Sequence, residues 1–143
     1  MESEIAKAYI AEKKTSEAVP HASEAYRNAK AILLDGGITQ RGLDEVLDTG
    51  MVVHECYKTL GSIKEADDAL EAGRKTGAAI GSASLYYYAA DKLITYRTET
   101  GRKPLATETF QNLLVSAPKE LNSKQAQAEV VKALKKREKQ YHL

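Results

Sequence analysis

Two Gly-Arg-Lys triplets are the first candidates for chemistry in this chain of 143 residues. They occupy residues 73–75 and 101–103, on either side of a segment rich in small and aromatic side chains. Arginine and lysine at each end of that segment could hold phosphate groups of a nucleic acid. The alternative is that each triplet is a helix end or a turn whose charges are solvated. No glycine-rich phosphate loop, His-Glu-x-x-His motif, Cys-x-x-Cys motif or nucleophile elbow accompanies them.

His54 and Cys56 lie two positions apart and are the nearest approach to a metal-binding pattern. Two candidate ligands do not make a metal site, so the sequence predicts no metal and no cofactor. Cys56 is the one cysteine of the chain, which excludes an internal disulfide. We expect Cys56 to behave as a small buried hydrophobic residue.

Arg137 and His142 have an Arg-x4-His spacing that resembles the motif of HEPN-type ribonucleases, which are small all-helical proteins. The segment 86–93 is also similar to the core helix of that family. This resemblance implies that Arg137 steadies the scissile phosphate and that His142 acts as general acid or base. Because His142 is the penultimate residue, where helices fray, the ribonuclease is kept as the alternative to a protein that is not an enzyme.

The elements that position these residues are all predicted to be helices. Valine, isoleucine and threonine never alternate over the length of a strand, whereas alanine, lysine, glutamate and leucine dominate. The predicted fold is all-α, with an N-terminal helical arm followed by a small helix bundle. The expected helices cover about 2–14, 16–34, 40–60, a stretch from 62, a small-residue stretch to about 96, 107–115 closed by Pro118, and 123–141. The length predicts one domain, and neither a signal peptide nor a membrane span is recognisable.

The small-residue stretch is the best candidate for packing against another helix. Its glycines recur every four residues, and each costs about 1 kcal/mol relative to alanine inside a helix. Close approach of another backbone would offset that cost, and three adjacent tyrosines add broad contact area. The predicted subunit-interface residues are Gly73, Gly77, Gly81, Tyr86, Tyr87 and Tyr88.

Charge is uneven along the chain although the net charge is only +1. Residues 35–71 carry three basic and nine acidic side chains, whereas residues 119–143 carry seven basic and three acidic ones. Opposite blocks of this kind favour head-to-tail contact between subunits, and solvated helix faces are the alternative. The lysine cluster between residues 132 and 139 indicates an anionic partner, because like charges so spaced repel within one helix.

Scattered positions over about residues 36–118 form a second and longer resemblance. They are Gly37-Ile38-Thr39, Arg41, Gly50, Leu60-Gly61-Ser62, Ala69, Gly73, Lys75, Thr95-Tyr96, Pro104, Asn112 and Pro118. In order and spacing this pattern resembles the major capsid proteins of rod-shaped and filamentous DNA viruses of archaea (rudiviruses, lipothrixviruses and tristromaviruses).

The capsid resemblance implies a structural virion protein assembled in the host cytoplasm. Residues 1–35 would be an arm that wraps double-stranded DNA, residues 36–118 a helix bundle, and residues 119–143 a basic C-terminal helix. Two copies, identical or paralogous, would form the dimer that repeats along a helical filament, with contact to envelope lipid left open. DNA binding would be electrostatic and independent of sequence. The predicted nucleic-acid-binding residues are Lys7, Lys13, Lys14, Arg27, Lys30, Arg74, Lys75, Arg102 and Lys103.

Overall fold

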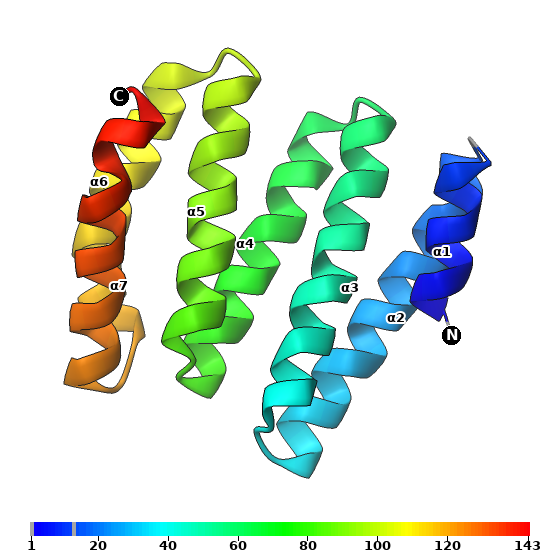
Figure 1. Cartoon of the computed structure of the whole chain (residues 1–143), viewed down its shortest axis with the longest axis horizontal. Helices are drawn as coiled ribbons and strands as arrows, with labels where there is room; N and C mark the ends of the chain where they lie inside the picture. The colour runs from blue at the N-terminus through cyan, green and yellow to red at the C-terminus, as the bar shows by residue number, and fades with distance from the viewer. Residues whose placement is uncertain (1, 13) are drawn as a thin grey trace. The chain divides into compact units, whose positions relative to one another are not determined.

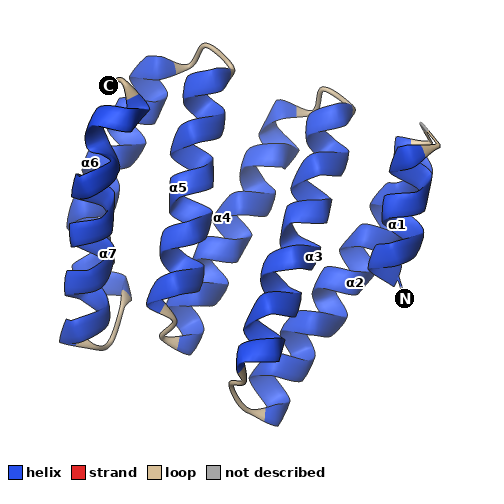
Figure 2. Cartoon of the chain, in the orientation of Figure 1, coloured by secondary structure: helices blue, strands red, loops and turns tan. Residues whose placement is uncertain are grey.

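The computed structural model describes residues 2–12 and 14–143, and every regular element among them is a helix (Figure 2). This confirms the predicted all-α class. The elements are α1 (Glu2–Ala11), α2 (Thr15–Gly36), α3 (Gln40–Thr59), α4 (Ile63–Ile80), α5 (Ala83–Glu99), α6 (Lys103–Glu120), α7 (Lys124–Arg137) and the 3-10 turn η1 (Glu138–Tyr141).

The chain divides into two compact units, where the sequence predicted one domain. Unit 1 is Met1–Gly73 and unit 2 is Arg74–Leu143, so α4 contributes residues to both. The boundaries predicted near residues 35 and 118 do not coincide with this division. The physical reason is packing: α2 lies along α3 and α1 packs on both, while α5, α6 and α7 pack on one another (Figure 1).

Unit 1 is built on small side chains. Alanines on α2 recur every three or four residues and are buried, which lets that helix approach its neighbours closely. Cys56 is fully buried in this core, as predicted. The buried cluster comprises Ala6, Ala18, Ala22, Val52 and Cys56.

Unit 2 has a larger apolar core to which α5, α6 and α7 each contribute one face. The Phe110 and Tyr141 rings meet edge to face with centroids 6.0 Å apart, which ties the C-terminal turn to α6. The core residues are Tyr86, Ala90, Ile94, Ala106, Phe110, Leu113, Ala117, Leu121, Ala126, Val130, Leu134 and Tyr141.

Two predicted helix starts are confirmed by their caps. The Thr39 hydroxyl accepts a hydrogen bond from the Gly42 amide at 3.0 Å, and Ser123 does the same for Ala126 at 3.3 Å. The prediction that Pro118 closes its helix is wrong, because α6 continues to Glu120. A proline so near the end of a helix removes one backbone bond, and burial of the neighbouring Ala117 offsets that loss.

The small-residue stretch is not one helix, which corrects the prediction. α4 ends at Ile80, Gly81 adopts a left-handed φ of 73°, and Ser82 caps α5 by accepting from the Leu85 amide at 3.2 Å. The close approach predicted for this stretch does occur at Gly77. A Cβ atom there would lie 2.6 Å from the backbone nitrogen of Tyr86, so Gly77 packs α4 onto α5 within unit 2.

Candidate nucleic-acid interface

Three of the five basic side chains predicted to wrap DNA from the N-terminal region are engaged by carboxylates. Lys7 Nζ lies 3.1 Å from Asp48 on α3 and 3.7 Å from Glu4, and the hydrogen bond to Asp48 raises the pKa of Lys7. Lys14 pairs with Glu12 at 3.7 Å. Each ion pair lowers the charge that a phosphate would meet.

Three further predicted contacts in this region differ in exposure. Arg27 pairs with Glu24, one helical turn earlier on α2. Lys30 is half-buried on the same helix. Lys13 lies outside the described residues. The first 35 residues therefore pack into unit 1, where Lys7, Lys14 and Arg27 are already paired with carboxylates.

Arg74, predicted to contact phosphate, is buried and already bonded within the chain. Its guanidinium pairs with Glu120 and donates to the Tyr86 hydroxyl at 3.3 Å, while that hydroxyl donates to Glu120 at 2.6 Å. Arg74 also lies over the Tyr86 ring, 5.5 Å from its centroid. Burial, and then the bond to Glu120, raise the pKa of Tyr86. This cluster holds α4, α5 and α6 together inside unit 2.

The remaining residues of the two Gly-Arg-Lys triplets are closer to the solvated alternative. Gly101 has a φ of 75° in the turn between α5 and α6. Arg102 stacks over the Tyr96 ring at 5.3 Å, and its Nε donates to the Thr100 hydroxyl at 2.8 Å. Lys75 and Lys103 are exposed and stay available to an anion.

A row of exposed lysines runs along the outside of α7 and η1, and we call it the lysine face. Residues 132, 135, 136 and 139 follow an i, i+3, i+4, i+7 spacing, which places them on one side of a helix. No ion pair involves them within the described part of the chain. The nearby Glu129 accepts instead from Gln125 at 3.3 Å. The lysine face consists of Lys124, Lys132, Lys135, Lys136 and Lys139.

The opposite side of α7 fixes this surface onto unit 2. Ala126, Val130 and Leu134 are buried in the core. Beyond them, Asp91 of α5 accepts from Arg137 Nε at 3.0 Å and from the Tyr141 hydroxyl at 2.5 Å. Burial and that hydrogen bond raise the pKa of Tyr141. The Asp91 carboxylate thus joins the end of α7 and η1 to α5.

The same bonds define the surroundings of the Arg-x4-His motif. Arg137 is the last residue of α7 and is held by Asp91, with a further bond to Gln140 at 2.5 Å. His142 lies beyond η1 in a left-handed conformation with φ of 58° and is exposed. The two residues do not share a helix, so α7 does not align them as an arginine–histidine pair.

The predicted interface residues are partly used within the chain. Tyr86 is fully buried, Tyr87 is half-buried and Tyr88 is 36% exposed with Lys92 over its ring at 5.6 Å. Of these three, Tyr88 is the most accessible to another subunit. Gly77 and Gly81 serve packing and a turn inside the fold, as described above.

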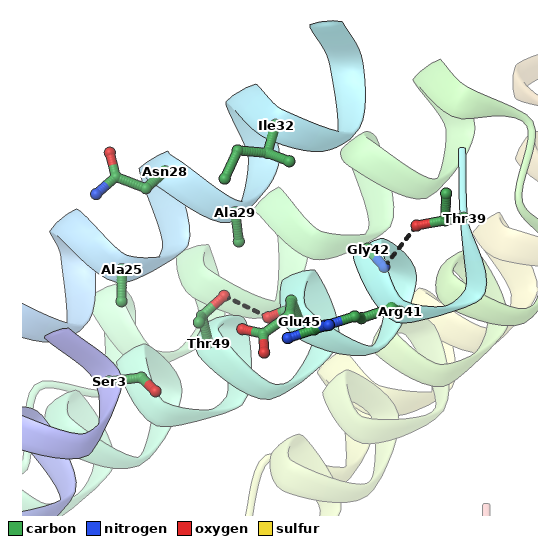
Figure 3. Close-up of a pocket in the computed structure, with 10 residues that line it drawn as sticks. All are labelled: Ser3, Ala25, Asn28, Ala29, Ile32, Thr39, Arg41, Gly42, Glu45 and Thr49. Atoms are coloured by element: carbon green, nitrogen blue, oxygen red, sulfur yellow. Dashed lines mark hydrogen bonds between the residues drawn. The ribbon is translucent and has the colours of Figure 1, made fainter. Parts of the chain in front are cut away.

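Unit 1 contains a pocket of about 460 Å³ where α1, α2 and α3 meet (Figure 3). Two of its polar side chains bond to the backbone of the chain: the Thr49 hydroxyl donates to the Glu45 carbonyl at 2.7 Å, and the Thr39 hydroxyl accepts from the Gly42 amide. No nucleophile paired with a base lines it. The lining residues are Ser3, Ala25, Asn28, Ala29, Ile32, Thr39, Arg41, Gly42, Glu45 and Thr49.

Two other features, a membrane-spanning helix and a cluster of metal ligands, are absent from the described residues. None of the described helices is both long and apolar enough to cross a bilayer, and no cluster of three potential metal ligands exists within residues 2–12 and 14–143. No family model, curated protein or solved structure matches the chain.

The lysine face is absent from the predicted set of binding residues, although its signal is present in the sequence. The spacing of residues 132–139 predicts one helix face. What the sequence could not supply is the pairing state of each cation. Lys7 meets a carboxylate 41 positions away, whereas the lysines of α7 meet none within the described chain.

Proposed function

We propose that this chain is a structural subunit that coats double-stranded DNA, as the major capsid protein of a filamentous virus does. Binding is electrostatic and independent of base sequence, and the chain has no catalytic role. The copies repeat as dimers, of one chain or of paralogues, along a helical filament. This is the function that the resemblance to archaeal viral capsid proteins implies.

The observation that carries this proposal is the opposite charge of the two units. Unit 1 holds eight basic and 14 acidic side chains, net −6, and unit 2 holds 13 basic and six acidic ones, net +7. A basic unit attracts a polyanion. An acidic unit on the same chain favours contact with the basic unit of a neighbour, and a heterologous contact that does not close produces a filament.

Apolar exposure in unit 1 further supports assembly between copies. Ile32, Leu34 and Ile38, at the end of α2 and in the turn after it, are 69%, 50% and 58% exposed. Exposed apolar side chains of this size are stabilised by burial against another protein surface. Such burial would supply assembly energy that salt does not screen.

Electron microscopy of negatively stained protein mixed with linear double-stranded DNA at low salt tests the proposal. We expect regular filaments that shed protein as salt is raised, because phosphate contacts release counterions. Protein without DNA and DNA without protein are the controls. Bare DNA beside discrete protein particles, even after a paralogous subunit is added, would contradict the coat.

A further inference from the structure

We infer that the lysine face of α7 and η1 is the surface that binds the DNA phosphates, and that the N-terminal helices are not. This inference rests on the proposed function and assigns its DNA site. It places the contact at Lys124, Lys132, Lys135, Lys136 and Lys139.

The cations of the lysine face differ from those of unit 1 in their pairing. The lysines of this face are exposed and have no carboxylate partner in the described chain, so a phosphate gains their full attraction. In unit 1 the corresponding cations already have partners: Lys7 with Asp48, Lys14 with Glu12 and Lys64 with Asp68. Binding there requires breaking an existing pair.

The geometry of the lysine face also suits a duplex. From Lys124 to Lys139 the face is about 20 Å long at the rise of an α-helix. A duplex carries one charge per about 1.7 Å of its axis, so phosphates are available along the whole row. The helix is held rigidly, because its opposite side is buried and its end is bonded to Asp91. A fixed, straight row of cations suits a stiff, regular polyanion.

The packing of α7 favours DNA over an anionic membrane as the partner. An amphipathic helix that binds lipid inserts its apolar face into the interface. In α7 that face, with Val130 and Leu134, is buried in the core of unit 2 and cannot insert. The lysine face offers only charge, which is sufficient for a phosphate backbone.

The salt dependence of binding gives the number of phosphates engaged. Five lysines predict a slope of log affinity against log salt of about −4.5 per subunit. A variant that keeps only Lys124 predicts a slope of about −0.9. Its affinity at low salt should fall on the order of 100-fold.

The test compares two quadruple variants that change net charge equally. Lys132→Gln, Lys135→Gln, Lys136→Gln and Lys139→Gln remove the lysine face. Lys7→Gln, Lys14→Gln, Lys58→Gln and Lys64→Gln remove four exposed, ion-paired lysines of unit 1. Fluorescence anisotropy with a labelled duplex measures affinity at several salt concentrations, and circular dichroism verifies that both variants fold.

We expect the α7 variant to bind DNA more weakly and with a shallower slope of log affinity against log salt. The unit 1 variant should keep its affinity within about threefold of the wild-type value and should keep its slope. Loss in the unit 1 variant alone, or in neither, would overturn the lysine face while leaving DNA coating in place. A wild-type chain that binds anionic phosphatidylserine vesicles but not DNA would overturn both. If the α7 variant is unfolded, the single changes Lys132→Gln and Lys135→Gln, each expected to reduce the slope by about 0.9, decide the question.

Discussion

The two units of this chain differ in what their carboxylates bind. In unit 1 exposed acidic side chains neutralise neighbouring lysines, as Asp48 does for Lys7, and Asp67 is buried. In unit 2 two carboxylates point inward: Glu120 holds Arg74 with Tyr86, and Asp91 holds Arg137 with Tyr141. Unit 2 thereby uses two partly buried acid groups to join its helices.

The consequence is a difference in surface charge that the overall net charge of +1 conceals. In unit 2, where two carboxylates bond to partly buried side chains, the exposed lysines of α7 and η1 stay unpaired within the described chain. Where carboxylates remain outside, lysines of similar exposure are matched. The pairing state of a cation, more than its presence in the sequence, decides whether it can attract DNA.

The largest loss of stability should come from adding a side chain at Gly77. Gly77→Val would place its Cβ atom 2.6 Å from the Tyr86 nitrogen, so α4 must move away from α5 and the Arg74–Glu120 cluster must shift. We expect a loss of about 3 kcal/mol in the free energy of unfolding, from overpacking and β-branching. Urea denaturation measures it. Gly36→Ala in unit 1, with nothing within 4 Å, is the control and should be close to neutral; equal losses would contradict the close approach.

The second largest loss of stability should come from removing Arg74, the buried cation of unit 2. Arg74→Met leaves Glu120 without its cation, although the Tyr86 hydroxyl still donates to Glu120, and we expect a loss of about 2 kcal/mol, reduced because Glu120 is 34% exposed. The adjacent Lys75→Met, at an exposed position, should change stability little. DNA affinity of the folded Arg74→Met protein should stay unchanged. A clear loss of affinity there would restore Arg74 as a phosphate contact.

Alkaline pH should weaken unit 2 through its buried tyrosines. The pKa of Tyr141 is raised in the folded state, so its stabilising contribution is complete below about pH 10 and is lost as pH rises above that value. Tyr141→Phe should cost about 1 kcal/mol at pH 7 through the lost bond to Asp91. It should also reduce the fall in stability above pH 10 by up to about 1.4 kcal/mol per pH unit. Identical slopes for both proteins, from denaturation between pH 8 and pH 11, would contradict this role.

The smallest effect is expected at His142. This residue is exposed and α7 ends before it, so His142→Ala should leave stability, DNA affinity and filament formation unchanged. A labelled single-stranded RNA incubated with the wild-type chain should stay intact. Cleavage that His142→Ala abolishes would instead establish the ribonuclease alternative and contradict a purely structural subunit.

The sequence predicts where the helices lie better than how they pack on one another. The caps at Thr39 and Ser123 are local hydrogen bonds, so residue identity and position suffice to find them. Gly81 was predicted to be a packing residue, yet it forms a turn, because a left-handed glycine and a helical glycine look alike in a sequence.

The candidate site shows the same difference between local patterns and tertiary contacts. The spacing of the lysines on α7 is visible in the sequence, whereas the burial of Arg74 depends on Glu120, 46 positions away. The partner of Lys7 is 41 positions away. Contacts over such separations are set by tertiary packing, which local patterns do not encode, so the paired N-terminal lysines and the unpaired α7 lysines look equivalent until the chain is folded.

Lysine footprinting tests the difference between the units most directly. Folded protein is acetylated briefly with and without saturating duplex DNA, and mass spectrometry reads the modification of each lysine. The account predicts strong protection by DNA at Lys132, Lys135, Lys136 and Lys139, with Lys7 and Lys58 unchanged. Protection at Lys7, with the α7 lysines as reactive as in free protein, would contradict it.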